Sequence, residues 1–138
     1  MSSDSPLDSQ VLTQFRASLQ QQEFELRQVI DKAEKEVRAL SDVGPLDSVD
    51  LSCGNSFKES MFAHISQIRR QLRLVQYALE RIGNGEFGVC ADCEGTIGLK
   101  RLQAVPWAIH CFDCQERFEQ VQMRAAMVER YRGNTIQC

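Results

Sequence analysis

The order of hydrophobic and polar residues predicts two long amphipathic helices in the first two thirds of the chain. In the first segment an apolar residue recurs at every seventh position, at Leu12, Leu19, Leu26, Ala33 and Leu40. A second set of apolar residues lies between these positions, at Phe15, Ile30 and Val37. The intermediate position at Gln22 is polar. A seven-residue repeat of this kind is typical of a coiled-coil helix. The stretch Ser41–Pro45 contains Gly and Pro, which end helices.

A second heptad helix is predicted to begin near Ser56, because Ser56 and Glu59 have the spacing of a capping box. Its apolar residues alternate between steps of four and three, at Met61, Ile65, Ile68, Leu72, Val75, Leu79 and Ile82. The run Gly83-Asn84-Gly85 ends it. Two such helices joined by a short loop favour an antiparallel coiled-coil hairpin. At 1.5 Å per residue, the second arm would be roughly 40 Å long.

Four cysteines form the clearest candidate for a metal-binding site in the sequence. Cys90-Ala-Asp-Cys93 and Cys111-Phe-Asp-Cys114 are two Cys-x-x-Cys pairs separated by seventeen residues. Each pair can direct two sulfurs inward from a tight turn, and two such turns complete a tetrahedron around one Zn²⁺. Four thiolates leave no coordination position open for water or substrate. The pattern therefore predicts one structural zinc ion and argues against a hydrolytic zinc enzyme.

The same cysteines could instead form two disulfides, or remain thiols that only pack. Residues 1–10 contain no apolar signal-peptide region, and disulfides are rare inside cells. Both points favour zinc. His110 could replace one sulfur, but the set of four cysteines is complete without it. Cys53 and Cys138 lie outside the cluster, and we expect them to be ordinary free thiols.

A third helix is predicted from Gln115 to Arg132, with Phe118, Val121, Ala125 and Val128 on one face and Gly133 as a stop. The C-terminal module is too small for a secure core of its own, so the metal and the start of the first helix, Leu12 to Leu19, should complete it. We expect a mainly α fold, with a long antiparallel coiled-coil hairpin and a small globular module that contains the four-cysteine zinc finger and a C-terminal helix. The expected divisions are a flexible N-terminus over 1–10, a hairpin over 11–84 with its tip at 41–56, and the zinc module over 85–138.

Composition narrows the class of protein. The chain of 138 residues has a net charge of −3, which argues against a dedicated DNA-binding protein. It has no run of about eighteen apolar residues, so we expect no membrane span. Aromatic residues make up 7% and prolines number three, which suits long helices better than a β-sandwich. We expect a soluble, cytoplasmic protein.

Charge is sorted along the predicted hairpin. The loop carries Asp42, Asp47 and Asp50, and Lys and Arg are absent from 41 through 57. Further along the second helix lie Arg69, Arg70 and Arg73. The hairpin would thus have an acidic tip and a basic section of shaft. A solvated turn and a solvated helix surface would account for the same charges without a function, since Asp is favoured in turns and caps.

The region around the cysteines has a specific pattern, in which the stretch 85–93 is followed by Ile97, Arg101, Leu102, Ala104, Pro106, Cys111 and Cys114. This pattern resembles that of the DksA/TraR family of zinc-finger transcription regulators. The preceding hairpin is similar to that of full-length members, so the resemblance covers nearly the whole chain. The run Asp47-Ser48-Val49-Asp50-Leu51-Ser52 is similar to the family's tip motif, Asp-x-x-Asp-x-Ala, at the same distance from the first cysteine.

The resemblance implies a protein that binds bacterial RNA polymerase directly, without sequence-specific DNA binding of its own. In the family the hairpin enters the secondary channel of the polymerase and alters the stability of promoter complexes, a role tied to the stringent response. By this likeness Asp50 is the main candidate for the tip that approaches the active site, with Asp47 and Ser52 beside it. Arg69, Arg70 and Arg73 are candidates for contact with acidic polymerase surface.

Three departures from the family pattern have consequences. Ser52 stands where the tip motif has Ala, and Glu94 replaces a glycine, so we expect Gly95 to take over that turn. The family's basic residues that hold the phosphates of the alarmone ppGpp correspond here to Leu74, Val105 and Gln115, none of which is charged. Phosphate affinity depends on charge-assisted contacts, and the sequence therefore predicts weak or absent ppGpp synergy.

The residues alone leave other functions open. A zinc ribbon that binds nucleic acid would have only Lys100, Arg101 and Arg117 as nearby cations, which is few for a phosphate-binding surface. A redox sensor that ejects zinc on oxidation is compatible with the polymerase-binding function. His64 and His110 have no nucleophile or base near them in the sequence pattern, so we expect no enzyme. Because the two arms of the hairpin would cover each other's apolar stripes within one chain, we expect a monomer.

Overall fold

The computed structural model describes residues 7–42 and 48–134, with side chains left out over 48–55 and 133–134. Within these residues four helices follow one another, α1 (Ser9–Ser41), α2 (Ser48–Asn84), α3 (Leu99–Ala104) and α4 (Phe112–Asn134). The described residues form no β-sheet, and their one isolated antiparallel bridge joins Val89 to Thr96. The predicted mainly α fold is confirmed.

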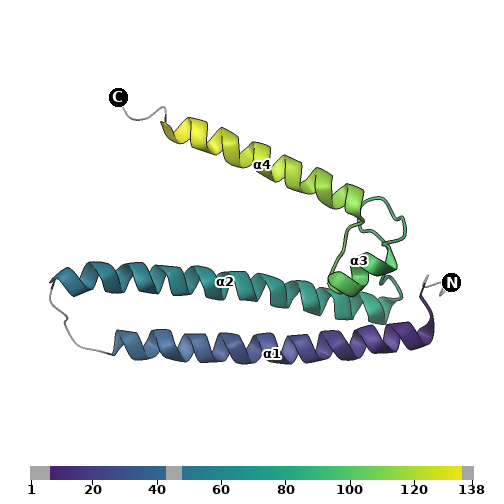
Figure 1. Ribbon diagram of the computed structural model, residues 1–138, viewed down its shortest axis with the longest axis horizontal. Coiled ribbons are helices and arrows are strands. Elements are labelled where there is room, and N and C mark those ends of the chain that lie inside the picture. Colours follow the sequence, from purple (N-terminus) through teal and green to yellow (C-terminus); the bar gives the residue numbers. More distant parts are fainter. Residues whose placement is uncertain (1–6, 43–47, 135–138) are drawn as a thin grey trace.

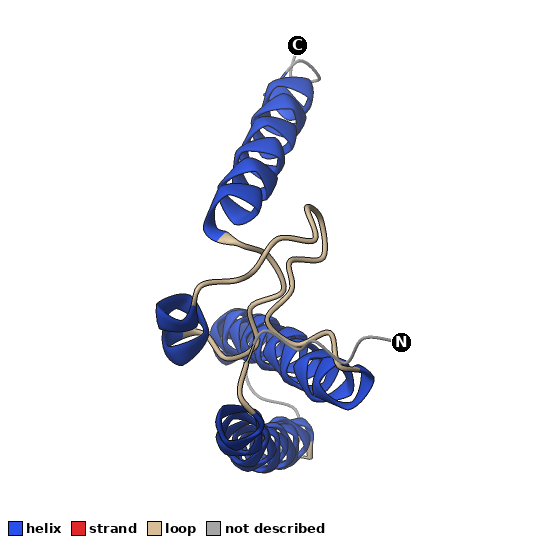
Figure 2. Cartoon of the chain, turned by 90° about the vertical axis from the view of Figure 1, so that its right-hand side faces the viewer, coloured by secondary structure: helices blue, strands red, loops and turns tan. Residues whose placement is uncertain are grey.

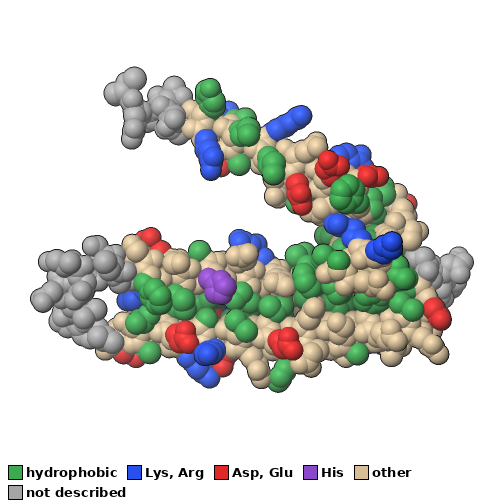
Figure 3. All heavy atoms as spheres, viewed as in Figure 1, with side chains coloured by type: hydrophobic (Ala, Val, Ile, Leu, Met, Phe, Trp, Pro, Cys, Tyr) green, Lys and Arg blue, Asp and Glu red, His purple; other side chains and the backbone are tan. Residues whose placement is uncertain are grey.

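The two long helices α1 and α2 lie side by side and run in opposite directions (Figure 1). The buried residues of α1 are Phe15, Leu19, Ala33 and Val37, and those of α2 include Ile65, Ile68, Val75, Ala78 and Ile82. All of them except Ala78 are positions of the predicted heptads. Hydrophobic side chains accordingly line the boundary between the two arms (Figure 3). The antiparallel hairpin is confirmed.

The second arm starts earlier than predicted. Helix α2 begins at Ser48, eight residues before Ser56. Between those positions Gly54 is the main residue that disfavours a helix, and one interior glycine costs only about 1 kcal/mol relative to alanine. The prediction of a helix start at the capping box was therefore wrong, because Ser56 and Glu59 lie inside the helix. Much of the segment expected as a tip, 41–56, is helical backbone.

Helix α1 begins two residues before the expected start of the hairpin at 11. Residues 1–6 lie outside the described part, but Ser9 and Gln10 belong to α1. Leu7, just ahead of the helix, packs against the main core. The backbone N–H of Leu12 donates to the carbonyl oxygen of Asp8 at 3.0 Å. An apolar contact and a helical hydrogen bond thus connect the start of α1 to the core.

The hydrophobic core has two parts. The larger part lies at the base of the hairpin and joins all four helices or the loops between them: Phe15, Leu19, Val75, Ala78, Ile82, Phe87, Cys90, Ile97, Leu102 and Cys114. The rings of Phe15 and Phe87 are 5.3 Å apart within it. The smaller part, Ala33, Val37 and Ile65, lies toward the far end of the hairpin. The predicted packing of the first helix against the C-terminal module is confirmed.

Helix α4 leaves this base and diverges from the hairpin (Figures 1 and 2). It begins at Phe112, three residues before the predicted start, and continues to Asn134, past the stop predicted at Gly133. The predicted apolar face exists but is exposed to solvent. Phe118, Val121 and Val128 are 47%, 66% and 54% exposed. The face thus has the sequence pattern of a packed helix, but most of its apolar surface is open to solvent.

Candidate functional site

The four cysteines meet at one point at the base of the hairpin. Cys90 and Cys93 lie in the turn between α2 and α3, Cys111 lies just before α4, and Cys114 is in its first turn. Their four Sγ atoms are all within 4.8 Å of one another, and Cys93 Sγ is 3.8 Å from Cys111 Sγ. Zinc–sulfur bonds of 2.3 Å in a tetrahedron would separate sulfurs by about 3.8 Å. The donor set therefore fits one four-coordinate zinc ion.

Backbone hydrogen bonds shape the first turn of this site. The N–H of Cys90 donates to the carbonyl oxygen of Gly95 at 2.7 Å, and that of Ile97 donates to the carbonyl oxygen of Gly88, also at 2.7 Å. Gly88 has φ +85°, and a Cβ there would lie 3.2 Å from Cδ1 of Leu7. Glycine adopts this left-handed backbone with the least strain, and any other residue would also have to displace the Leu7 side chain. The turn is thereby held against the start of α1.

The turn after the second cysteine differs from the prediction. Glu94 itself has φ +58°, whereas Gly95 is not among the residues with positive φ in the described chain. The expectation that Gly95 would take over the left-handed position was wrong. The reason is that the N–H of Glu94 donates to the carbonyl oxygen of Cys90 at 3.1 Å, which fixes the left-handed residue at position 94. A non-glycine residue in this conformation costs on the order of 1 kcal/mol.

The surroundings of Cys90 favour its thiolate. Burial opposes the charge, but hydrogen bonds from the backbone N–H groups of Cys93, Cys111 and Asp92 outweigh it and lower the pKa of Cys90 to about 6. One of these, from Cys111 N to Cys90 Sγ, is 3.3 Å long. One ligand is therefore already ionised at neutral pH, in the form that binds zinc.

The other sulfurs ionise less readily because they are crowded together. The neighbouring sulfur of Cys111, together with burial, raises the pKa of Cys114 to about 12. The N–H of Gly95 favours the Cys93 thiolate, but the sulfurs of Cys90 and Cys111 outweigh it and raise the pKa of Cys93. Four thiolates at this spacing need a central cation. The chemistry of the donor set thus matches Zn²⁺, which displaces protons from its ligands.

A cation from α4 supports the same site. Arg117 Nη2 donates to Cys114 Sγ at 3.1 Å, and that contact raises the pKa of the Arg117 guanidinium. Four thiolates around Zn²⁺ carry a net charge of −2, so a guanidinium beside them stabilises the complex. Sequence reasoning counted Arg117 only as a possible nucleic-acid contact. Its position three residues after Cys114, one helical turn away, was the available signal.

His110 lies beside the ligands but outside the cluster. Its Nε2 is 3.8 Å from Asp92 Oδ2, and its ring stacks on Phe118 with centroids 5.8 Å apart. The group of possible metal ligands in the described residues contains the four cysteines without it. This agrees with the interpretation that His110 does not replace a sulfur.

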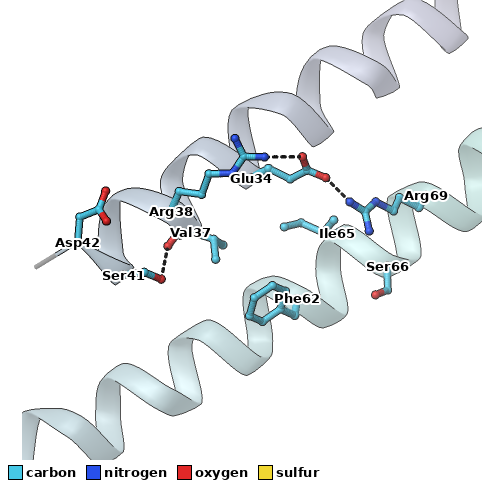
Figure 4. A pocket seen from close by; sticks show the side chains of 9 residues that line it. All are labelled: Glu34, Val37, Arg38, Ser41, Asp42, Phe62, Ile65, Ser66 and Arg69. Atoms are coloured by element: carbon cyan, nitrogen blue, oxygen red, sulfur yellow. Dashed lines mark hydrogen bonds and ion pairs between the residues drawn. The ribbon is translucent and has the colours of Figure 1, made fainter.

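The basic shaft residues differ in their contacts. Arg69 forms an ion pair across the hairpin with Glu34 on α1, and Arg38 lies 3.7 Å from the same carboxylate (Figure 4). Arg70 and Arg73 are exposed, and they form no ion pair within the part of the chain that the structure describes. Arg69 thus joins the two arms, whereas Arg70 and Arg73 are presented outward.

A groove of about 550 Å³ runs between the arms near this cross-link. Val37 and Ile65 form its apolar base, and Phe62 projects into it with 56% of its surface exposed (Figure 4). The Ser41 hydroxyl donates to the carbonyl oxygen of Val37 at 3.1 Å. Glu34 and Ser41 are therefore already used by the hairpin itself, and Phe62 is the main apolar group that the groove offers to a partner.

The predicted tip is only partly described. Asp47 lies outside the described residues. Asp50 and Ser52 lie on the helical backbone at the start of α2, in a stretch whose side chains are not described. An acidic residue in the first turn of a helix is stabilised by the helix dipole. The start of α2, which carries Asp50 and Ser52, is at the end of the hairpin opposite the base (Figure 1).

The three positions predicted to correspond to the family's ppGpp-binding cations are uncharged. Leu74 is 37% exposed on α2, and Val105 is half-buried after α3. Gln115, in the first turn of α4, donates from Nε2 to Glu119 Oε1 at 2.8 Å. Its amide is therefore engaged by a carboxylate, which would repel a phosphate.

Comparisons with known proteins agree with this architecture. The model of the family described as "Prokaryotic dksA/traR C4-type zinc finger" matches residues 85–120. An uncharacterized protein of Aquifex aeolicus is 30% identical over 117 residues, which cover 82% of this chain and 74% of that protein. The RNA polymerase-binding transcription factor DksA of Escherichia coli is 26% identical over 104 residues, which cover 75% and 68%. The structure of the transcription factor DksA2 from Pseudomonas aeruginosa superposes with a TM-score of 0.74 at 29% identity, over 84% of this chain and 88% of that one.

The chain belongs to the DksA/TraR family. With the cysteine geometry, this membership identifies the metal centre as one structural zinc site. None of the helices in the described part is both long and apolar enough to cross a membrane.

Proposed function

We propose that the chain is a transcription regulator that binds bacterial RNA polymerase through its hairpin. The observation that carries the proposal is the match to DksA2 over nearly the whole of both chains, at a TM-score of 0.74. That match includes the hairpin as well as the zinc module. The related factor of Escherichia coli is named as RNA polymerase-binding, which supports the same partner here.

In the proposed mechanism the hairpin enters the secondary channel and brings Asp50, with Asp47 and Ser52, toward the active-site region. Helix α2 has 37 residues, about 55 Å at 1.5 Å per residue, so the tip can act far from the base. A carboxylate placed near the catalytic Mg²⁺ and mobile elements changes the local electrostatic field without covalent chemistry. The consequence would be altered stability of promoter complexes.

The division of the chain into regions has a role in this mechanism. The zinc module over 85–138 would be the anchor, and the hairpin over 11–84 would be the probe. The zinc ion holds the anchor together with all four positions filled by sulfur, so it supplies stability and no catalysis. We propose a monomer, since the α1–α2 seam is satisfied within one chain, and a bacterial cytoplasmic location, where the polymerase is.

Direct recognition of nucleic acid is less well supported. Arg101 Nε donates to the carbonyl oxygen of His110 at 3.0 Å, and Arg117 contacts Cys114. Two of the three cations near the zinc site are therefore committed to internal contacts, and the third, Lys100, is exposed. This is too few for a surface that follows a phosphate backbone.

We also propose that ppGpp adds little to the activity. Leu74, Val105 and Gln115 provide no positive charge, and phosphate groups are held mainly by charge-assisted contacts. Inhibition of a ribosomal-RNA promoter should then be nearly the same with and without ppGpp. A strong dependence on ppGpp in an assay with this protein would contradict this part of the proposal.

The test of the main proposal is multi-round transcription with purified RNA polymerase at a ribosomal-RNA promoter. Native protein should inhibit, whereas Asp50→Asn, which keeps the shape and removes one charge, should lose most of the inhibition. Asp31→Asn is the matched control, because Asp31 is an exposed carboxylate on the shaft. Equal inhibition by Asp50→Asn and native protein would reject the tip assignment. Absence of polymerase binding by native protein would reject the function.

A further inference from the structure

Arg81, in the last turn of α2, is a buried cation that sequence reasoning did not single out. It is 5% exposed and is the one charged residue among the buried polar positions of the described chain. Its Nη2 donates to the carbonyl oxygens of Glu86 at 3.0 Å and Val89 at 2.6 Å. Its guanidinium lies 5.8 Å from the centre of the Tyr77 ring.

Arg81 has no anionic partner within the described residues. Among those side chains, no carboxylate forms an ion pair with it, and its Nε is buried without a hydrogen-bond acceptor. A buried charge without a counterion is unfavourable for folding. Two carbonyl oxygens and one ring face therefore carry the stabilisation of this cation. This arrangement costs stability that a buried apolar residue would not cost, which points to a role beyond packing.

The two carbonyl oxygens bound by Arg81 belong to the connection between the hairpin and the zinc module. Along the chain, 85–89 is the direct passage from α2 to Cys90. Gly85 has φ +75° and Gly88 has φ +85° in this passage, so both bends occur at the residue type with the least restricted backbone. The N–H of Glu86 also donates to the carbonyl oxygen of Arg81 at 2.9 Å. Arg81 thus holds this passage through both its side chain and its backbone.

We propose that Arg81 is a positioning residue that fixes the direction of the zinc module and α4 relative to the hairpin. Both bonds come from Nη2, whose two N–H groups have fixed directions in the guanidinium plane, and an apolar side chain of similar length supplies neither bond. Its bridge prevents rotation at Gly85 and Gly88. The apolar core at the base holds the parts together, and Arg81 selects one angle between them. This inference does not depend on polymerase binding.

The test measures the distance between the hairpin and α4 by pulsed electron paramagnetic resonance. Spin labels are attached through unnatural amino acids at Gln67 and Gln122, which are both exposed, so that the zinc-binding thiols stay unmodified. Native protein should give one narrow distance distribution. Arg81→Met, which removes the charge and keeps the approximate length, should at least double its width while one zinc ion per chain is retained. Arg70→Met is the control, because Arg70 is exposed on the same helix.

A native width in zinc-loaded Arg81→Met would overturn the proposal. If that variant loses its zinc, Arg81→Gln decides, since glutamine stays polar but is about two bonds shorter and cannot reach both carbonyl oxygens. A widened distribution in zinc-loaded Arg81→Gln would support the role, and a native width would reject it. Both measurements are made on the free protein, so failure here and failure of the proposed polymerase binding are separate results.

Discussion

The hairpin and α4 differ in how their apolar stripes are used, although the sequence pattern of the two is similar. Along the hairpin, Val75 is fully buried between the arms. Along α4, Val121 lies on an equally regular stripe and is 66% exposed. The hairpin helices are thus held along their length by packing. Helix α4 is held mainly at its N-terminal end, where Cys111 and Cys114 bind the metal and Cys114 enters the core.

This difference indicates that the chain has two separate sources of stability, hydrophobic burial in the hairpin and zinc binding in the C-terminal module. Hydrophobic burial stabilises the hairpin, because each arm covers the other's apolar face. The C-terminal module has a small core of its own and depends on zinc binding. The larger hydrophobic cluster connects the two, since it contains residues of both. Changes at the metal and changes in the seam should therefore affect different regions first.

Removal of zinc should produce the largest effect. Structural zinc contributes on the order of 10 kcal/mol to folding in small zinc domains. After chelation, amide hydrogen exchange should show loss of protection throughout 85–134. The distal hairpin around Ala33, Val37 and Ile65 should keep most of its protection, because that cluster contains no residue of the zinc module. Equal loss of protection in both regions would show that one cooperative unit, and not two, unfolds.

Acid should also release the zinc ion, with the same loss of structure in the zinc module that chelation causes. The crowding that raises the pKa of Cys93 and Cys114 means that protons compete strongly for those sulfurs once zinc is absent. Zinc affinity should therefore fall as the pH falls, and the module should lose structure with it. The lowered pKa of Cys90, about 6, makes that sulfur the last to be protonated. Zinc release followed with a chromophoric chelator over a pH series measures the effect, and an affinity that does not change with pH would contradict it.

A matched pair of substitutions sharpens the comparison between the two stripes. Val75→Ala removes fully buried methyl groups from the seam and should lower the free energy of unfolding by about 2 kcal/mol. Val121→Ala, on the exposed stripe of α4, should change it by less than about 0.5 kcal/mol. Urea denaturation of the zinc-loaded proteins measures both. A large cost for Val121→Ala would mean that α4 has a packing partner in solution.

Much of the fold was predictable because its signals are local and periodic. The heptads predicted both arms, the buried positions and their antiparallel packing. The two Cys-x-x-Cys pairs predicted the zinc site, since their ligand types and spacing are sufficient to define it. The start of α2 at Ser48 was not predictable from turn residues, because a single glycine and one capping pattern are weak signals against continued helix.

The features that the sequence did not predict depend on tertiary contacts, which a local pattern of residues does not encode. The exposed face of α4 has the same spacing as a buried one, and only the direction of the helix after Cys114 decides which it is. Arg81 looks like an ordinary surface arginine in the sequence, although the fold buries it against the start of the zinc module. The left-handed backbone at Glu94 likewise depends on a hydrogen bond to Cys90 and not on residue preference.

The most local predicted effect concerns the contact between Arg117 on α4 and the metal ligand Cys114. Arg117→Gln removes the cation beside Cys114 Sγ, and loss of an outer-shell partner typically lowers metal affinity by about 10- to 100-fold. Competition with a chromophoric chelator measures the change. Arg124→Gln, on the exposed surface of the same helix, should leave zinc affinity unchanged. Because hairpin packing does not involve Arg117, thermal unfolding of the distal hairpin should be the same in both variants. Similar zinc affinity in Arg117→Gln and native protein would mean that the four sulfurs and their backbone donors alone determine affinity, and that Arg117 is a surface residue of α4.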